Sequence, residues 1–436
     1  MASQEIRPNR DIPDQVLTDR TITGDVAFEM SFGVADDILA ASLQDSVTWH
    51  GLPVIANAAV TAGTPNVFSV ASAAGIVANH LIYASGFSTA ANNGVFVVSS
   101  VTGTTITCSS APPTAETSGA TKKVKVIGFT STAGDITATA TGLGSTALNF
   151  TTLGLAVGQW VDVGGAAAGA QFATAANNSF ARIVAIAPNA LTLDNLPQNW
   201  APDPGTGKSI RVGVLDYIRN GTAQQSFTIE RGHTDAGQYF QFTGLYPEKL
   251  ALSLQAGQIL DATVTMRGIG APSPTAASAS TGGLLPAPTA SILNAVSNIV
   301  RLYEGGAAAG KVKQATWNAM NALRDQKAIG VLGNYGVGDG QFSATMTMAV
   351  YLTATAGIAI YSKFINATVS QLSFPVQDAA GNTYIFELPA VKFTDCQPPS
   401  ATVNQDQILS FTASALIDTA VTGAMAQISR IAGAGY

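Results

Sequence analysis

Residues 226–270 read SFTIERGHTDAGQYFQFTGLYPEKLALSLQAGQILDATVTMRGIG. Apolar and polar residues alternate along most of this stretch, a period that is typical of strands with one buried face. The four alternating runs are 227–229, 240–242, 250–254 and 260–266. The turn-forming residues between them are 234–237, 244–247 and 255–257. The stretch therefore predicts four short strands in an antiparallel meander, with one dry face and one polar face.

A similar strand pattern lies near the N-terminus, in residues 26–32, and is followed by apolar residues at helical spacing in 34–43. Asp36 and Asp37 fall in the first turn of this predicted helix, where carboxylates complement the helix dipole. The two aspartates could also be proposed as a catalytic pair. Neighbouring side chains on a helix point about 100° apart, however, so they cannot flank one substrate bond. We therefore interpret the segment as a short amphipathic helix lying against a sheet.

The region from about residue 52 to 211 is rich in Ala, Gly, Thr and Ser, and it contains a repeat. FSTAANN at 87–93 recurs as FATAANN at 172–178, an offset of 85 residues with six of seven positions identical. Strand patterns follow each copy in the same order, which predicts two small β-domains in tandem. The repeated Asn-Asn is expected to be a turn device, because Asn tolerates left-handed backbone and bonds its own main chain.

Pieces of one β-rich unit lie before and after this tandem, so we interpret the tandem as an insertion whose ends lie close together. After the meander, the order of strand and then helix recurs in 341–352 and 354–364, which suggests an internal duplication. The expected organisation is an extended N-terminal arm at 1–20, a first unit at 21–51 and 212–270, inserted domains at 52–135 and 136–211, a linker at 271–289 and a second unit at 290–436.

The amino-acid sequence of several short runs resembles that of the tail tube proteins of long-tailed phages with non-contractile tails. The resemblance covers roughly residues 20–50 and 212–430, and the order and spacing of the runs carry it. The runs are SFTIERG and the segment after it at 226–239, LALSL at 250–254, GQILDATVTM at 257–266, LRDQ at 323–326, the glycine-rich 333–340, QDAAGNTY at 377–384, LPAVKFT at 388–394 and DQIL at 406–409. It implies a mainly β fold with two tail-tube-type β-sandwich or barrel units, each with a short flanking helix.

The resemblance also implies a function and partners. Such proteins form rings that stack into a hollow tube, a conduit through which double-stranded DNA leaves the capsid. The implied partners are further copies of the chain, in a trimeric ring if the tube unit is duplicated and otherwise in a hexameric ring, together with the tape measure, tail tip and tail terminator proteins. The protein is then expected in the virion tail after assembly in the host cytoplasm, with the inserted domains decorating the tube exterior.

The bore of such a tube must let the duplex slide, so its wall is expected to be polar or acidic rather than basic. On the last strand of the meander, the face opposite the predicted core carries Asp261, Thr263, Thr265 and Arg267. The counterpart in the second unit is Ser410, Thr412 and Ser414. We expect one of these two faces to line the lumen. An ordinary solvent-exposed face is the alternative interpretation.

The composition argues against several other classes of protein. Only 11% of residues are charged, against about 25% in an ordinary soluble domain, so much of the surface is expected to be covered by other copies or partners. The net charge of −6 and the lack of a basic arm argue against tight phosphate binding. The N-terminus lacks the apolar stretch of a signal peptide. The sequence also contains no run of 18 apolar residues, the length that would predict a membrane span.

The residues that usually carry chemistry are scattered. Cys108 and Cys396 are expected to be two buried thiols of a protein assembled in a reducing cytoplasm, and His50, His80 and His233 have no metal ligands at suitable spacing. The run GTGKS at 205–209 lacks the first glycine of a phosphate-binding loop, and a strand rather than a helix is predicted after it. We therefore expect no enzyme activity, cofactor or metal. The alternatives are a surface adhesion or glycan-binding protein and a capsid decoration protein.

Overall fold

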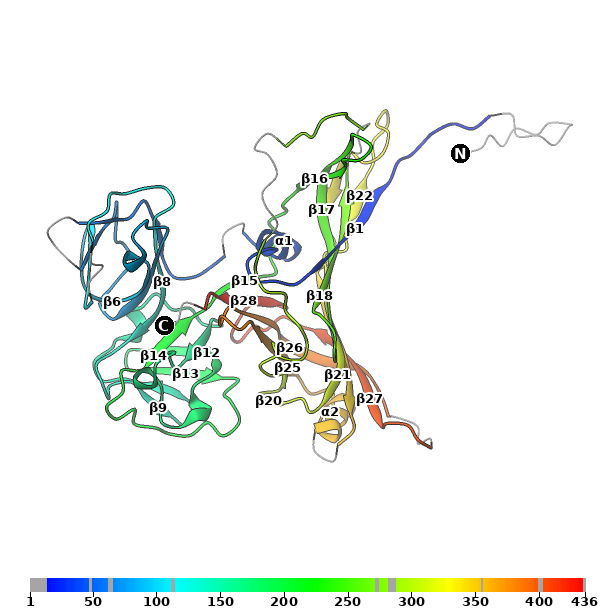
Figure 1. Cartoon of the computed structure of the whole chain (residues 1–436). Coiled ribbons are helices and arrows are strands. Elements are labelled where there is room, and N and C mark those ends of the chain that lie inside the picture. The colour runs from blue at the N-terminus through cyan, green and yellow to red at the C-terminus, as the bar shows by residue number, and fades with distance from the viewer. Residues whose placement is uncertain are drawn as a thin grey trace, which may run out of the picture.

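The computed structural model describes residues 14–46, 49–61, 66–110, 114–270, 274–280, 288–353, 356–398 and 403–433. The fold is mainly β, as the sequence predicts. Two antiparallel sheets of 13 strands each and a two-stranded ribbon hold the strands of this part of the chain. Figure 1 shows the two large sheets as separate bodies that meet near the middle of the molecule. None of the helices found there is long and apolar enough to cross a membrane.

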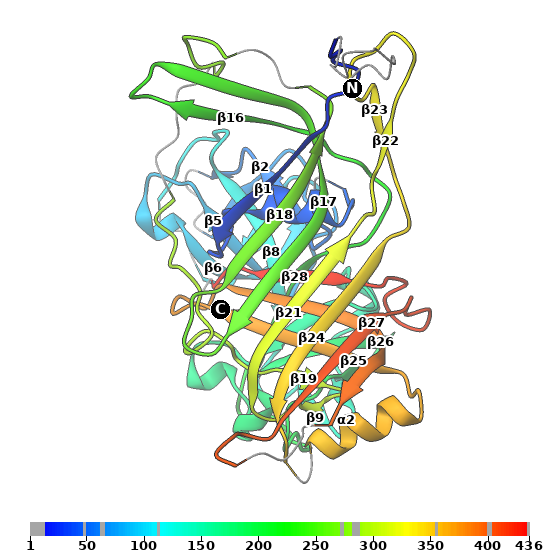
Figure 2. The same cartoon turned by 90° about the vertical axis from the view of Figure 1, so that its right-hand side faces the viewer.

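The first sheet contains a run of seven neighbouring strands that we call the long sheet (Figure 2). In spatial order these strands are β1 (Ile22–Glu29), β18 (Asp261–Gly268), β17 (Gln238–Gln255), β21 (Val312–Met320), β24 (Ser343–Tyr351), β27 (Ile408–Ala415) and the C-terminal half of β26 (Thr383–Gln397). Elements from both predicted units therefore belong to one continuous sheet.

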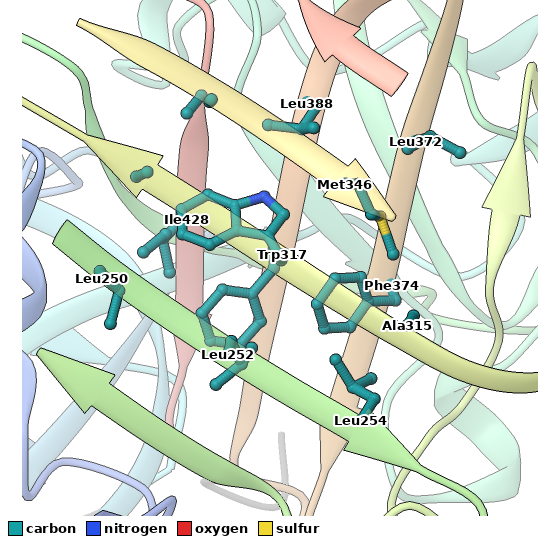
Figure 3. Packing of buried hydrophobic residues seen from close by; sticks show 14 of the residues in the cluster. Leu250, Leu252, Leu254, Ala315, Trp317, Met346, Leu372, Phe374, Leu388 and Ile428 are labelled. Atoms are coloured by element: carbon teal, nitrogen blue, oxygen red, sulfur yellow. The ribbon is translucent and has the colours of Figure 1, made fainter. Parts of the chain in front are cut away.

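The main core lies between the long sheet and a layer behind it. That layer consists of β25 (Ser370–Gln377), the N-terminal half of β26, β28 (Gln427–Ile431) and β15 (Asp216–Arg219). Trp317 of β21 is fully buried at the centre and packs edge-on against Phe386, with ring centroids 5.9 Å apart. Figure 3 shows Trp317 surrounded by apolar side chains from both layers. The alternating apolar residues of the sequence thus face inward, toward this core.

The meander has three strands rather than the predicted four. The strands are β16 (Phe227–His233), β17 and β18, and β17 runs without a break through residues 244–247. Gly244, with φ of +61°, and the register shift after Pro247 absorb the irregularity inside the strand. The strand continues because β16 pairs with its first half while β18 and β21 pair with its second half.

Other predicted boundaries shift for similar reasons. The apolar patterns of 383–387 and 390–393 predict two strands, but the structure has one strand there, β26, and Pro389 lies at a register shift against β25. The sequence pattern of 298–304 also predicts a strand, but only β19 (Tyr303–Glu304) forms there, and it pairs with β20 (Ala307–Ala308). The glycine-rich run near 333–340 contributes β23 (Gly336–Gly338), paired with β22 (Arg324–Gln326) in the separate ribbon.

The order of elements repeats along the first sheet. We call the elements from β1 to β18 that belong to this sheet the first half, and those from β24 to β28 the second half, into which β21 leads. A strand is followed by a helix in both halves: β1 by α1 (Asp36–Ser42), and β24 by α2 (Ala356–Ile365). The neighbours β1-β18-β17 of the first half correspond in order to β24-β27-β26 of the second half. In addition, β16 pairs with β17 as β25 pairs with β26, while α1 contacts β17 and α2 contacts β26. This repeated order supports an internal duplication.

The second large sheet is formed by residues between Val54 and Val214. Its strands are β2 (Val54–Ala56), β3 (Ala59–Val60), β4 (Val67–Ser69), β5 (His80–Ser85), β6 (Gly94–Thr102), β7 (Thr105–Cys108), β8 (Lys123–Thr130), β9 (Thr137–Thr139), β10 (Gly142–Gly144), β11 (Trp160–Val163), β12 (Phe180–Ala187), β13 (Ala190–Asp194) and β14 (Arg211–Val214). Because β14 pairs with β8 and β11, the chain returns to the first sheet after Val214 and not at residue 212.

The repeated motif has the same hydrogen bonds in both copies. Asn93 accepts a hydrogen bond from the main chain of Phe87 at 2.9 Å, and Asn178 accepts one from Phe172 at 2.8 Å. Each amide also donates back to the carbonyl of the same phenylalanine. The asparagines therefore close these loops through main-chain hydrogen bonds, as expected. They do so with negative φ angles, −97° and −90°, so the expected left-handed backbone is wrong.

Candidate functional site

One face of the long sheet lies opposite the core, and the second sheet lies on the other side of the molecule (Figures 1 and 2). We call the face of the long sheet that is turned away from the core the open face. Directly paired residues of an antiparallel sheet share a face, so its members follow from the strand register. One row across the sheet is Ala27, Thr263, Ala251, Asn318, Thr345, Ser414 and Lys392. The next row is Glu29, Asp261, Ser253, Thr316, Thr347, Thr412 and Asp395.

The register brings together the two sets of residues that the sequence offered as alternatives. Both sets lie on the open face and are exposed or half-exposed, four strands apart in the same sheet. They are Asp261, Thr263, Thr265 and Arg267 on β18, and Ser410, Thr412 and Ser414 on β27. The open face is therefore lined largely by small polar side chains.

Sequence reasoning missed the contribution of the strands between these two sets. Ser253, Thr316 and Thr347 complete the polar row from β17, β21 and β24. The signal was present, because each alternates with buried neighbours such as Trp317 and Met346. What the sequence could not supply was the pairing of β17 with β21, which joins the two halves into one sheet.

The charges on the open face are unevenly balanced. Glu29 lies directly opposite Asp261, and like charges at such positions destabilise a sheet. Arg267 is balanced by two carboxylates, Glu248 at 2.7 Å and Asp325 at 3.0 Å, and the hydrogen bonds that it donates to Glu248 raise the pKa of the guanidinium. The positive charge of Arg267 is therefore compensated locally, while the Glu29–Asp261 pair leaves a negative region near the edge of the sheet.

The long sheet ends in two strand edges that have no partner strand among the described residues. At one end, β1 pairs only with β18. At the other end, residues 392–397 of β26 pair with β27 on one side only, because β25 and β28 pair with the first part of β26. Exposed edges of this kind are templates for pairing with another chain.

The other chemical candidates remain separate. Within the described ranges, no three His, Cys, Asp or Glu side chains are grouped to hold a metal ion. His80 is buried, and burial lowers its pKa to about 4. Cys108 and Cys396 are both buried, in different sheets. The GTGKS run is followed by β14, a strand, so it lacks the helix that a phosphate-binding loop needs.

Comparison with known families decides between the possible uses of such a sheet. A family model described as phage tail tube protein matches residues 1–418. The chain belongs to the phage tail tube protein family. This tail tube protein is accordingly a structural component of the phage tail that assembles with itself and with other tail proteins into a tube. The structural role of the family points to a protein without enzymatic activity. A search of curated proteins finds no significant match.

Proposed function

We propose that this tail tube protein forms stacked rings in which the open face lines a bore for double-stranded DNA. The observation that carries the proposal is the strand register, which gathers polar residues of both halves on one uncovered face. The bulk of the chain, including the second sheet, lies on the other side of the long sheet. In a ring with the open face inward, residues 54–214 decorate the exterior.

The chemistry of the open face suits a sliding duplex. Clustered Lys and Arg would bind the phosphate backbone, so a conduit needs few unpaired cations. Here Arg267 is paired with Glu248 and Asp325, and the two other cations of the face, Lys249 and Lys392, are outnumbered by four carboxylates. These carboxylates are Asp25, Glu29, Asp261 and Asp395. The unfavourable placement of two like charges across a strand pair is understandable if the negative region repels phosphate during passage.

The two unpaired strand edges suggest how copies join. Within the chain, the last strand of the first half, β17, pairs with β21, the strand that leads into the second half. No described strand of the first half corresponds to β21, so the edges left to pair between copies are residues 392–397 of β26 and β1 of the next copy. Such a contact is heterologous and closes into a ring. Closure removes both exposed edges.

The number of strands favours three copies per ring. Seven strands of the long sheet per chain give about 21 strands in a trimer, and a barrel with 4.8 Å spacing and a tilt of about 40° is then about 40 Å across its backbone. A ring of six copies would have a backbone diameter of about 85 Å by the same calculation. The duplicated order of elements agrees with a trimer that replaces a ring of six single units.

The remaining parts of the proposal follow from the same assembly. The tube belongs to a tail of the non-contractile type, assembled in the host cytoplasm. The tape measure protein is the partner inside the bore, and the tail tip and tail terminator proteins are the partners at the two ends of the tube. No membrane is involved in this role.

Negative-stain electron microscopy of the purified protein tests the proposal. Rings or tubes with a three-fold symmetry are the expected result. Elongated monomers at all concentrations would contradict it and favour a surface adhesion protein, and closed shells would favour a capsid component. A six-fold ring would retain the tube but refute the trimer.

A further inference from the structure

The helix α2 has apolar side chains on both of its faces. Ile360 points inward and is buried with the main core, whereas Ile358, Tyr361 and Ile365 point outward and are 56%, 37% and 62% exposed. Leu352 and Val369 at the two ends of the helix segment are also exposed. A surface helix normally carries polar residues on its outer face, and a helix that is apolar all round is normally buried. The outward apolar patch of Ile358, Tyr361 and Ile365 is therefore expected to be covered in the assembled protein.

The counterpart helix α1 is covered within the same chain. Residues 39–42 of α1 are buried. Its C-terminal end is held by Asn321, which donates to the carbonyl of Ser42 at 3.0 Å, and by Asp339, which accepts from Gln44 at 2.6 Å. Asn321 and Asp339 lie in the segment that follows β21 and leads into β24, the first strand of the second half.

The duplication gives α2 a counterpart of this covering segment. Within the described part of the chain, residues 14–21 lead into β1, the first strand of the first half. These residues are exposed, and Leu17 is 67% exposed, while Asp19 pairs with Lys327, next to the ribbon of the same chain. Figures 1 and 2 show this arm extending from β1 at one end of the molecule, while α2 lies at the opposite end. The arm therefore does not cover α2 of its own chain.

We propose that residues 14–21 of one copy pack on the outward face of α2 in the neighbouring copy of the same ring, with Leu17 as the apolar anchor. This inference rests on the proposed ring. The arm adjoins β1 and α2 contacts β26, so the contact lies beside the proposed pairing of these two strand edges. Each junction then has a hydrogen-bonded part and an apolar part. The arm of one copy then occupies, at α2 of its neighbour, the place that the segment with Asn321 and Asp339 occupies at α1 inside one chain.

Site-specific photo-crosslinking tests this contact in the assembled full-length protein. Tyr361 is replaced by the photoreactive amino acid p-benzoylphenylalanine, which preserves an aromatic side chain, and the assembled rings are irradiated and digested with trypsin. Residues 11–20 form one tryptic peptide because Arg10 and Arg20 flank it. The expected product links this peptide to the peptide that contains position 361. Assembly from a mixture of isotope-labelled and unlabelled chains shows that the link joins two copies.

The outcomes separate this inference from the proposed function. Wild-type protein that never assembles would refute the ring itself. Rings in which position 361 crosslinks to the ribbon of β22 and β23, to the second sheet or to nothing would refute the arm contact and leave the ring intact.

Substitutions give an independent measure of the same contact. Leu17→Asp and Ile365→Asp should each raise the concentration needed for ring formation about tenfold or more, because each removes an apolar anchor. Val54→Asp is the matched control, since Val54 is 57% exposed on the second sheet and should leave assembly unchanged. Equal assembly of all three variants would overturn the inference.

Discussion

The substitution Arg182→Met is predicted to weaken the attachment of the second sheet to the first. Arg182 of β12 and Glu387 of β26 are almost fully buried, and their Nη1 and Oε1 atoms are 2.6 Å apart. Trp160 donates to the other carboxylate oxygen of Glu387 at 2.7 Å, and Asp194 pairs with Arg182 at 2.6 Å. An apolar cluster that joins both sheets, including Leu215 and Ile385, surrounds this network.

The expected cost follows from the burial of Glu387. Removing Arg182 leaves a carboxylate without its cation in the interior, which typically costs about 3–5 kcal/mol, whereas an exposed ion pair contributes about 1 kcal/mol or less. The double variant Arg182→Met with Glu387→Gln should be more stable than the single variant, because it removes the unpaired charge. The Gln oxygen can still accept the hydrogen bond from Trp160.

The pH dependence gives a second readout. Burial raises the pKa of Glu387, and the charge of Arg182 partly opposes this rise. A carboxyl group with a raised folded-state pKa contributes its full stability below its unfolded pKa, and the contribution is lost as pH rises through the folded pKa. Without Arg182 the folded pKa rises further. The gap in stability between the single and the double variant should therefore narrow as the pH is lowered.

Urea denaturation of unassembled protein, followed by tryptophan fluorescence, measures these differences between variants. The reasoning would be refuted if Arg182→Met cost less than about 1 kcal/mol, the value of an exposed pair. It would also be refuted if the double variant were no more stable than the single variant at neutral pH.

Three further predictions concern the core, the open face and the inserted region. Trp317→Ala should cost about 3–5 kcal/mol in the free energy of unfolding, because the indole is fully buried between the two layers; a small change in urea midpoint would argue against this core. Replacing both Glu29 and Asp261 by Lys should leave the fold intact but make assembled tubes bind short duplex DNA in a salt-dependent way, whereas absence of binding would argue against an inward open face. Burial opposes the ionisation of Asp135, but hydrogen bonds from Ser131, Ser145 and nearby main chain hold its pKa below the usual range. The stability it contributes is present above its unfolded pKa and lost as pH falls through the folded pKa, so Asp135→Asn should destabilise the protein at pH 7, and the cost should shrink steadily as the pH is lowered below the unfolded pKa.

The sequence predicts much of the local structure because burial leaves a periodic trace. The alternation around Leu250 and around Val264 corresponds to β17 and β18, and the repeated asparagines form matching hydrogen bonds. The breaks were predicted less well. Gly244 and Pro389 look like strand ends, yet β17 and β26 continue through them because neighbouring strands hold both sides of each irregularity.

The candidate site shows where local patterns stop being informative. Alternation alone predicts that Thr263 and Thr412 each face away from a core, but only the pairing of strands from both halves puts them on one face. The buried pair of Arg182 and Glu387 leaves no local signal at all, because the two residues are 205 positions apart. Contacts of this kind depend on the packing of complete sheets.

The central claim is that the open face lines the bore of the tube, and cryo-electron microscopy of assembled tubes tests it most directly. The account predicts a reconstruction in which Thr263, Thr316 and Thr347 face the bore, β1 pairs with β26 of the next copy, and residues 54–214 lie at the largest radius. A reconstruction with residues 54–214 around the bore, or with the open face on the outer surface, would contradict it.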